Sequence, residues 1–188
     1  MTKLSKRIIF RARINGVNEH IKKFDFYETP TWGTELLLST IEIPVGAHIL
    51  EPCNGLGSIS TILKQNGYKV TTFDVNPEMQ ADQYLDFLEY KGHEQFDAVI
   101  TNPPFKTNNN WEFTKKALET TKEGGLVIML GILSKLEGQK RKKFYDESPL
   151  YRVLVHSKRY NINGKVGIGY AWFIWKKGFK GDTILKII

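Results

Sequence analysis

Short apolar runs alternate with amphipathic segments along most of this chain. The short runs are typical of buried strands, and the amphipathic segments are typical of helices. Strands that alternate with helices in this way predict an α/β domain built on a mainly parallel sheet. The expected strands are 47–51, 68–74, 96–101, 125–131, 151–156 and 170–175, and the expected helices are 31–40, 58–66, 77–90, 111–121 and 137–145.

The last two expected strands, 151–156 and 170–175, are joined by about thirteen residues that show no apolar helix pattern. A connection this short suits an antiparallel pair, because parallel strands need a longer crossover. We therefore expect an antiparallel last strand on an otherwise parallel sheet. Open sheets of this kind bind ligands at the carboxyl ends of their strands, so the chemistry should lie just after the strands.

The strand at 47–51 runs into a turn that contains two glycines, Gly55 and Gly57. Glycines at this spacing let the backbone turn sharply and approach a ligand closely before a helix begins. The third glycine that a dinucleotide-binding loop carries three residues later is absent from the sequence. The turn therefore suits a ligand-binding loop, and it is also compatible with a simple tight connection between strand and helix.

Asp74 ends the strand at 68–74, about twenty residues after the glycine loop. An acidic side chain at this place can accept hydrogen bonds from two ribose hydroxyls. The alternative is structural, since Asp74 can also cap a helix that begins near Pro77.

The most specific feature is the run Asn-Pro-Pro-Phe at 102–105, directly after the strand at 96–101. The two prolines fix the backbone and lack N–H donors, so their carbonyls are pure acceptors beside the side-chain carbonyl of Asn102. The ring of Phe105 can stack on a planar base. Acceptors next to a stacking ring suit a conjugated amino group, which becomes more nucleophilic when two acceptors grip its hydrogens. A rigid Pro-Pro turn without a chemical role is the structural alternative.

Together these residues resemble the amino-group DNA methyltransferases that modify N6 of adenine, in the subgroup whose cofactor motif precedes its catalytic motif. The resemblance covers roughly residues 27–180 and is closest to the small adenine methyltransferases of phages and prophages. It rests on Tyr27-Glu28-Thr29-Pro30, the glycine loop, Asp74, Asp86-Phe87-Leu88, the run at 102–105 and the aromatic strand at 170–175.

The resemblance implies a Rossmann-like class I methyltransferase fold, with a seven-stranded, mostly parallel sheet and an antiparallel last strand. It implies S-adenosylmethionine as the cofactor. Asn102, Pro103, Pro104 and Phe105 would be the catalytic residues that hold and stack the target adenine. The implied cofactor-binding residues are Tyr27, Thr29, Pro30, Glu51, Pro52, Asn54, Gly55, Gly57, Asp74, Val75, Asp86, Phe87 and Asn102.

The net charge is +7, and it is unevenly distributed along the chain. Residues 1–23 carry seven basic side chains against one acidic, and residues 135–165 carry nine against three. Residues 24–134, between them, carry seven against fifteen. Basic segments suit a polyanion such as nucleic acid, although they are also compatible with a simple solvated surface. We expect a basic N-terminal arm at 1–23 and a methyltransferase domain at 24–188.

A methyltransferase acting on DNA must flip its target base out of the stack, and it needs contacts to the phosphate backbone. The resemblance places a second base-contacting aromatic in the loop before the last strand, where Tyr160 lies; a surface tyrosine is the alternative. The expected nucleic-acid contacts are Lys140, Arg141, Lys142, Lys143, Lys158, Arg159 and Tyr160.

Several classes of protein are not expected. Cys53 is the only cysteine, and the four histidines show no metal spacing, so we expect neither a disulfide nor a metal site. We see no signal peptide and no apolar run of membrane-spanning length, and we expect a cytoplasmic protein. The sequence leaves no room for a separate recognition domain, so a homodimer that widens the DNA contact is one expectation.

The sequence thus predicts methyl transfer from S-adenosylmethionine to N6 of adenine in DNA. Two alternatives stay open. The first keeps the chemistry and changes the acceptor to adenine in RNA or a glutamine amide in a protein. The second is an inactive cofactor-binding or nucleic-acid-binding module, which would have no chemical need for the run at 102–105.

Overall fold

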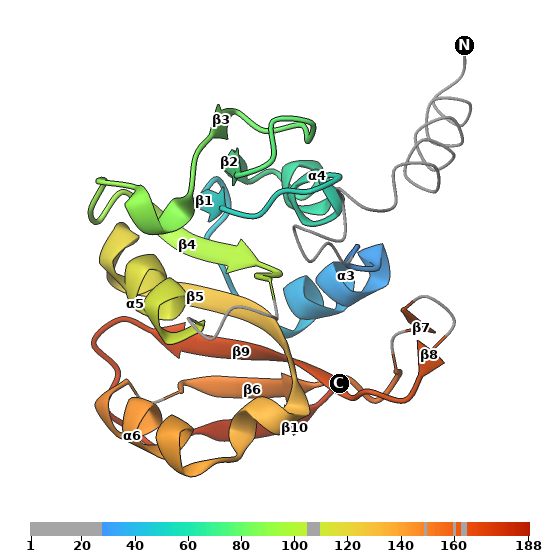
Figure 1. Cartoon of the computed structure of the whole chain (residues 1–188), viewed down its shortest axis with the longest axis vertical. Coiled ribbons are helices and arrows are strands. Elements are labelled where there is room, and N and C mark those ends of the chain that lie inside the picture. Colours follow the sequence, from blue (N-terminus) through green and yellow to red (C-terminus); the bar gives the residue numbers. More distant parts are fainter. Residues whose placement is uncertain (1–27, 105–109, 149, 160, 163–164) are drawn as a thin grey trace.

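The structure, a computed structural model, has an eight-stranded sheet at its centre (Figure 1). The strands lie in the order β10-β6-β9-β5-β4-β1-β2-β3. The structure describes residues 28–104, 110–148, 150–159, 161–162 and 165–188. The strand bounds are β1 His48–Glu51, β2 Lys69–Asp74, β3 Gln83–Tyr84, β4 Phe96–Thr101, β5 Thr121–Ile132, β6 Arg152–Val155, β9 Tyr170–Lys176 and β10 Ile184–Ile187.

The strand directions confirm a mainly parallel sheet with one reversed strand. β1 pairs in parallel with β2 and with β4, and β4 pairs in parallel with β5. β9 is antiparallel to both of its neighbours, β5 and β6, as expected for the strand at 170–175. The final strand, β10, lies parallel to β6 and is an addition to the expected set.

Helices cover both faces of the sheet (Figure 1). Successive side chains of a strand point to opposite faces, so Trp172 packs with α3 and α4 while Phe173 packs with α5 and α6. No helix in the described part of the chain is long and apolar enough to cross a membrane. The helix bounds are α3 Thr31–Thr40, α4 Ser58–Gln65, α5 Asn110–Thr120 and α6 Gln139–Glu147.

The expected helices at 31–40, 58–66 and 111–121 are confirmed to within one residue at each end. α4 ends as expected, because Gly67 takes a left-handed φ of 83°. α6 begins two residues later than the expected 137–145, since Gly138 has a φ of 107° that no helical residue adopts.

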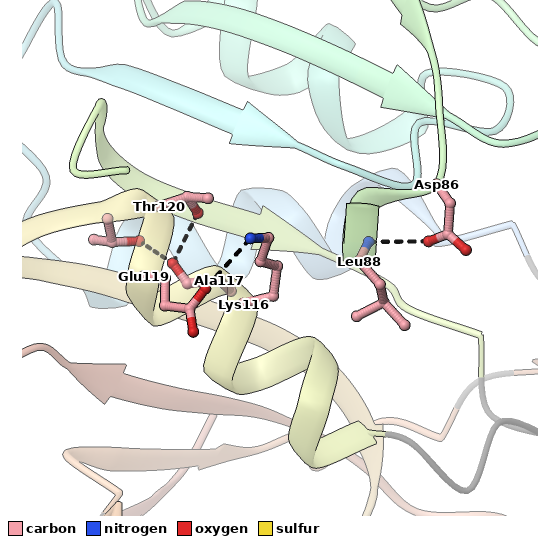
Figure 2. A network of polar contacts seen from close by, with 7 residues as sticks. Asp86, Leu88, Lys116, Ala117, Glu119 and Thr120 are labelled. Carbon is pink, nitrogen blue, oxygen red and sulfur yellow. Dashed lines mark hydrogen bonds and ion pairs between the residues drawn. The ribbon is translucent and has the colours of Figure 1, made fainter. Parts of the chain in front are cut away.

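The prediction of a helix at 77–90 is wrong. The segment contains only the two-residue strand β3 and a short 3-10 helix, η1, Phe87–Glu89. Asp82 accepts hydrogen bonds from both the backbone N–H and the hydroxyl of Thr72, at 2.8 and 2.9 Å, which ties it beside β2. Asp86 accepts from the N–H of Leu88 at 2.9 Å (Figure 2). Such side-chain bonds to the backbone compete with helix formation, and in this segment they replace the α-helix.

β5 starts four residues earlier than the expected 125–131, with no loop between it and α5. The hydroxyls of Thr120 and Thr121 both donate to the carbonyl of Ala117, at 2.9 and 2.7 Å (Figure 2). These two bonds occupy a carbonyl in the last turn of α5, and the β-branched residues then continue directly into the strand.

The sheet therefore has eight strands where seven were expected. β10 was missed because all four of its residues are exposed, so it lacks the pattern of a buried strand. The connection between β6 and β9 contains a small hairpin, β7 Asn161–Ile162 and β8 Lys165–Val166, that pairs with itself.

Candidate functional site

Three loops meet at the carboxyl edge of the sheet, which we define as the edge where β1, β2 and β4 end. The backbone N–H of Asn54, after β1, donates to the carbonyl of Phe73 in β2 at 2.9 Å. The N–H of Gly55 donates to Oδ2 of Asp74 at 2.7 Å. These two bonds lock the glycine loop onto the end of the neighbouring strand.

The glycine loop has the conformation that its two glycines permit. Gly55 and Gly57 have φ angles of 52° and 75°, in the left-handed region that other residues rarely adopt. The side chain of Asn54 braces the turn, because its Oδ1 accepts from the Ser60 hydroxyl at 2.6 Å and its Nδ2 donates to the carbonyl of Gln80. The loop thus enters α4 in a fixed shape, with Asn54 and Pro52 buried beneath it.

Asp74 is buried, and both of its carboxylate oxygens accept backbone hydrogen bonds. Oδ2 accepts from Gly55, and Oδ1 accepts from the N–H of Asn76 at 2.8 Å. Each carboxylate oxygen has capacity for a further bond, so a ribose hydroxyl can still be accommodated. The alternative role as a helix cap is ruled out, since no helix begins near Pro77.

Glu51, the last residue of β1, is an ionisable group in an apolar setting. Its side chain is 1% exposed. Oε1 accepts from the N–H of Cys53 at 3.0 Å, whereas Oε2 is buried and lacks a well-aligned donor among the described residues. Burial raises the pKa of Glu51 to about 8, against smaller opposing effects of the Thr101 hydroxyl and the Cys53 N–H. In its ionised form, Glu51 could therefore accept a hydrogen bond at Oε2 from a cation bound at the carboxyl edge.

Asn102 follows β4 directly and is held from across the edge. Its Nδ2 donates to the hydroxyl of Thr29 at 3.0 Å, over 73 residues of sequence. Pro103 is buried and Pro104 is half-buried. Thr29 itself is 5% exposed and precedes Pro30, the N-cap of α3. The structure therefore brings the run at 102–104 together with the segment at 28–30.

Three other residues expected to contact the cofactor differ in how exposed their side chains are. Val75 is 54% exposed beside Asp74, which leaves an apolar surface at the edge. Asp86 is exposed, with Oδ1 bonded to Leu88 (Figure 2). Phe87 is 2% exposed, and its ring lies 4.9 Å from the ring of Phe113. Phe87 thus belongs to the core. Tyr27 and Phe105 lie outside the described residues.

The residues expected to contact nucleic acid differ in the hydrogen bonds and ion pairs that they already form within the protein. Arg141 donates to the carbonyls of Ser134 and, at 3.1 Å, Glu137, so it caps the 3-10 helix η2, Leu133–Leu136. Lys142 pairs with Asp146 at 2.6 Å on the exposed face of α6, and Lys143 is exposed without a carboxylate partner among the described residues. Tyr160 and the side chain of Lys140 lie outside the described part of the chain.

Lys158 and Arg159 follow β6 and are both exposed. Nη1 of Arg159 donates to the carbonyl of Gly167 at 3.0 Å. Nζ of Lys158 lies 5.1 Å from the ring centre of Trp32, in the first turn of α3. This cation–π contact brings a basic residue next to the segment that holds Asn102.

Sequence reasoning missed Trp32 and the role of His156. The Trp32 ring lies 5.5 Å from the imidazole of His156, which is 5% exposed. Burial lowers the pKa of His156 to about 4, so its imidazole is neutral near pH 7. No local signal predicts this pair, because the two rings are more than 120 residues apart. Among the described residues, no three His, Cys, Asp or Glu side chains are grouped to hold a metal ion.

A cavity of about 750 Å³ lies at the opposite, amino edge of the sheet. Its lining includes Asp97, Lys122 and Tyr151, and none of the residues expected to bind cofactor. Open α/β sheets bind ligands at the carboxyl edge, so we place the candidate site there and not in this cavity.

Comparison with known protein families gave no matching family model, and no curated protein sequence matched. Solved structures do match. A methyltransferase subunit of the type I restriction-modification system from Streptococcus thermophilus has a TM-score of 0.67 at 14% identity, with 87% of this chain and 47% of that one covered. The M protein of the type I restriction enzyme EcoKI has a TM-score of 0.60 at 16% identity, with 81% and 44% covered.

An S-adenosylmethionine-dependent O-methyltransferase from Thermotoga maritima has a TM-score of 0.61 at 14% identity, with 88% of this chain and 72% of that one covered. These matches show the fold, which is the Rossmann-like α/β fold of class I methyltransferases. The chain spans less than half of both restriction-modification proteins, and 63% of a matching structure from Listeria monocytogenes.

Proposed function

We propose that this protein transfers a methyl group from S-adenosylmethionine to the exocyclic N6 amino group of adenine in DNA. The observation that carries the proposal is the placement of Asn102. It follows β4 at the carboxyl edge, next to the glycine loop, and its amide is held by Thr29 at 3.0 Å. An oriented amide beside two prolines offers acceptors to an amino group and no competing backbone donor.

The described residues fit S-adenosylmethionine. The cofactor carries an ammonium group and two ribose hydroxyls. Glu51 Oε2 is a buried acceptor without a well-aligned donor, which suits the ammonium group. Asp74 has free acceptor capacity for the ribose, and the exposed Val75 offers an apolar surface for the adenine ring. When bound, the cofactor supplies an electrophilic methyl group on a sulfonium.

The protein's own residues would activate and orient the acceptor nitrogen. The lone pair of an aromatic amino group is delocalised into the ring, so the nitrogen is a weak nucleophile. The Asn102 carbonyl and the Pro103 backbone carbonyl can accept the two N–H bonds and localise the lone pair on nitrogen. The nitrogen held in this way would accept the methyl group that the sulfonium supplies, and its surplus proton would pass to water. Proximity and in-line orientation supply much of the remaining acceleration.

DNA is the acceptor that we infer from the basic surface. Lys143 and Lys158 are exposed basic residues without a carboxylate partner among the described residues. Three of the matching structures are proteins of type I restriction systems, and another is a putative RNA methyltransferase from Pyrococcus horikoshii. Basic side chains of this kind contact phosphates and position a duplex without reading its sequence.

Removal of charge from α6 should weaken DNA binding in a salt-dependent way. In the double variant Lys142→Gln, Lys143→Gln, we expect the slope of log K against log salt to fall by about one unit per lost phosphate contact. The matched control is Lys64→Gln, Lys69→Gln, since Lys64 lies in the last turn of α4 and Lys69 begins β2, both away from the carboxyl edge. Fluorescence anisotropy at several salt concentrations measures both slopes. Equal slopes for the two double variants would remove α6 from the proposed interface.

The reaction is tested by incubating the protein with labelled S-adenosylmethionine and duplex DNA, with bulk RNA and a cell protein extract as parallel acceptors. Nucleoside and peptide mass analysis then identifies the methylated group. N6-methyladenine in DNA supports the proposal. Label only in RNA or on glutamine keeps the amino-group chemistry and changes the substrate. Cofactor binding without label in any acceptor would favour an inactive module.

A further inference from the structure

Thr29 has a contact that the sequence did not predict, a hydrogen bond with Asn102. The resemblance implied a cofactor-binding role for Thr29. In the structure its Oγ1 accepts a hydrogen bond from Nδ2 of Asn102 at 3.0 Å, and the side chain is 5% exposed. A buried hydroxyl that bonds to an amide in this way restricts the rotation of that amide.

The segment that carries Thr29 is itself anchored at both ends. Oε1 of Glu28 accepts from the hydroxyl of Ser58, the first residue of α4, at 3.1 Å. The carbonyl of Gly33 accepts from the indole N–H of Trp172 at 3.0 Å, and this bond is buried. Thr29 therefore lies between one anchor on the glycine-loop helix and another on the central strand β9, which fixes its position independently of Asn102.

The orientation of the Asn102 amide decides whether the site can work. An amide has one face that accepts and one that donates, whereas the target amino group presents only donors. Because Nδ2 is bound to Thr29, the amide has one set orientation, in which Oδ1 is the atom that would accept from the target amino group. A flipped amide would turn its own N–H groups toward the amino group and leave both without an acceptor.

We propose that Thr29 is a positioning residue that holds Asn102 with Oδ1 directed at the target amino group. The inference rests on the proposed amino methyl transfer. It adds a residue that acts on the reaction through Asn102 and does not contact the transferred group.

The test compares Thr29→Val, which replaces the hydroxyl with a methyl group of the same shape, with Thr29→Ser, which keeps it. We expect Thr29→Val to lower the single-turnover rate at saturating cofactor about 10- to 100-fold, the rate equivalent of one lost hydrogen bond to an oriented group. The dissociation constant of S-adenosylmethionine should change by less than about threefold. That is well below the tenfold change that a loss of about 1.4 kcal/mol of binding free energy would cause. Thr29→Ser should restore the rate to near the wild-type value.

Thr34→Val is the matched control. Thr34 lies in α3, five residues after Thr29, and is fully buried, but its hydroxyl has no hydrogen-bond partner among the described residues. The same chemical change at this position should leave the rate and the cofactor affinity at wild-type values. A loss equal to that of Thr29→Val would show that the rate responds to packing of the segment and would overturn the inference.

A second readout does not depend on activity. In NMR spectra the side-chain amide of Asn102 should exchange slowly with solvent in the wild type and faster in Thr29→Val. Unchanged exchange, or a raised dissociation constant with an unchanged saturated rate, would overturn the positioning role. A failure of the proposed function looks different, since the wild type would then methylate no acceptor while the Asn102 amide still responded to Thr29→Val.

Discussion

Asn102→Ala is expected to lower the rate of methyl transfer by about 100- to 1,000-fold or more, the range seen when one preorganised polar group is removed from an active site. The alanine removes the side-chain carbonyl that would accept from the target amino group, and it leaves the glycine loop and Asp74 untouched. Cofactor affinity should therefore stay near the wild-type value. Single-turnover transfer and calorimetric titration of the cofactor measure the two quantities.

The control for this prediction is Asn66→Ala. Asn66 caps the end of α4, where its Nδ2 donates to the carbonyl of Ile62 at 2.9 Å, so its loss affects the helix and not the site. This variant should keep the wild-type rate. Full activity in Asn102→Ala would remove Asn102 from the catalytic role and the proposed mechanism with it.

Cofactor affinity is expected to rise about tenfold per pH unit between pH 6 and 7.5, because the ionised fraction of a carboxyl rises tenfold per unit below its pKa. Burial raises the pKa of Glu51 to about 8, so the group is largely protonated in this window. Only the ionised form can pair with the cofactor's ammonium group. Lower pH therefore weakens binding and higher pH strengthens it, until the ammonium itself titrates near pH 7.7–8.0.

Glu51→Gln should bind the cofactor weakly and show little pH dependence over the same window. Glu35→Gln, which changes an exposed carboxyl on α3, should keep the wild-type profile. Isothermal titration in buffers of different ionisation enthalpy also gives the number of protons released, which should approach one per cofactor bound near pH 6.5. A flat profile in the wild type, or the same slope in Glu51→Gln, would contradict the pairing.

The core of the fold could be predicted because local patterns and tertiary environment agree there. β4 is buried at every position except Asp97, which is half-buried. The helix α4 is bounded by Gly57 and Gly67, whose φ angles of 75° and 83° suit no other residue well. The segment after Pro77 could not be predicted from its helical composition. Its backbone is tied by Asp82 to Thr72 in the neighbouring strand, a contact that is visible only when the two segments are folded together.

The candidate site was predictable to the extent that it lies at strand ends. Gly55 and Asp74 were each expected at the carboxyl end of a strand; they lie there, and the N–H of Gly55 donates to Asp74 at 2.7 Å. The bond between Thr29 and Asn102 was not predicted, because no pattern in either segment specifies which side chain will face it. The packing of the Phe87 ring against Phe113 was not predicted either, because no local pattern in the sequence specifies which ring it contacts.

The bond from Trp172 to Gly33 has a consequence for how the protein is made. Asn102, the glycine loop and Thr29 are all synthesised before β9, yet the segment that holds Asn102 is anchored by an indole near the end of the chain. A domain generally folds as a unit during synthesis, and this site needs the late strand β9 to be complete. A nascent chain that ends before β9 therefore carries every residue of the motifs and still lacks the geometry to use them.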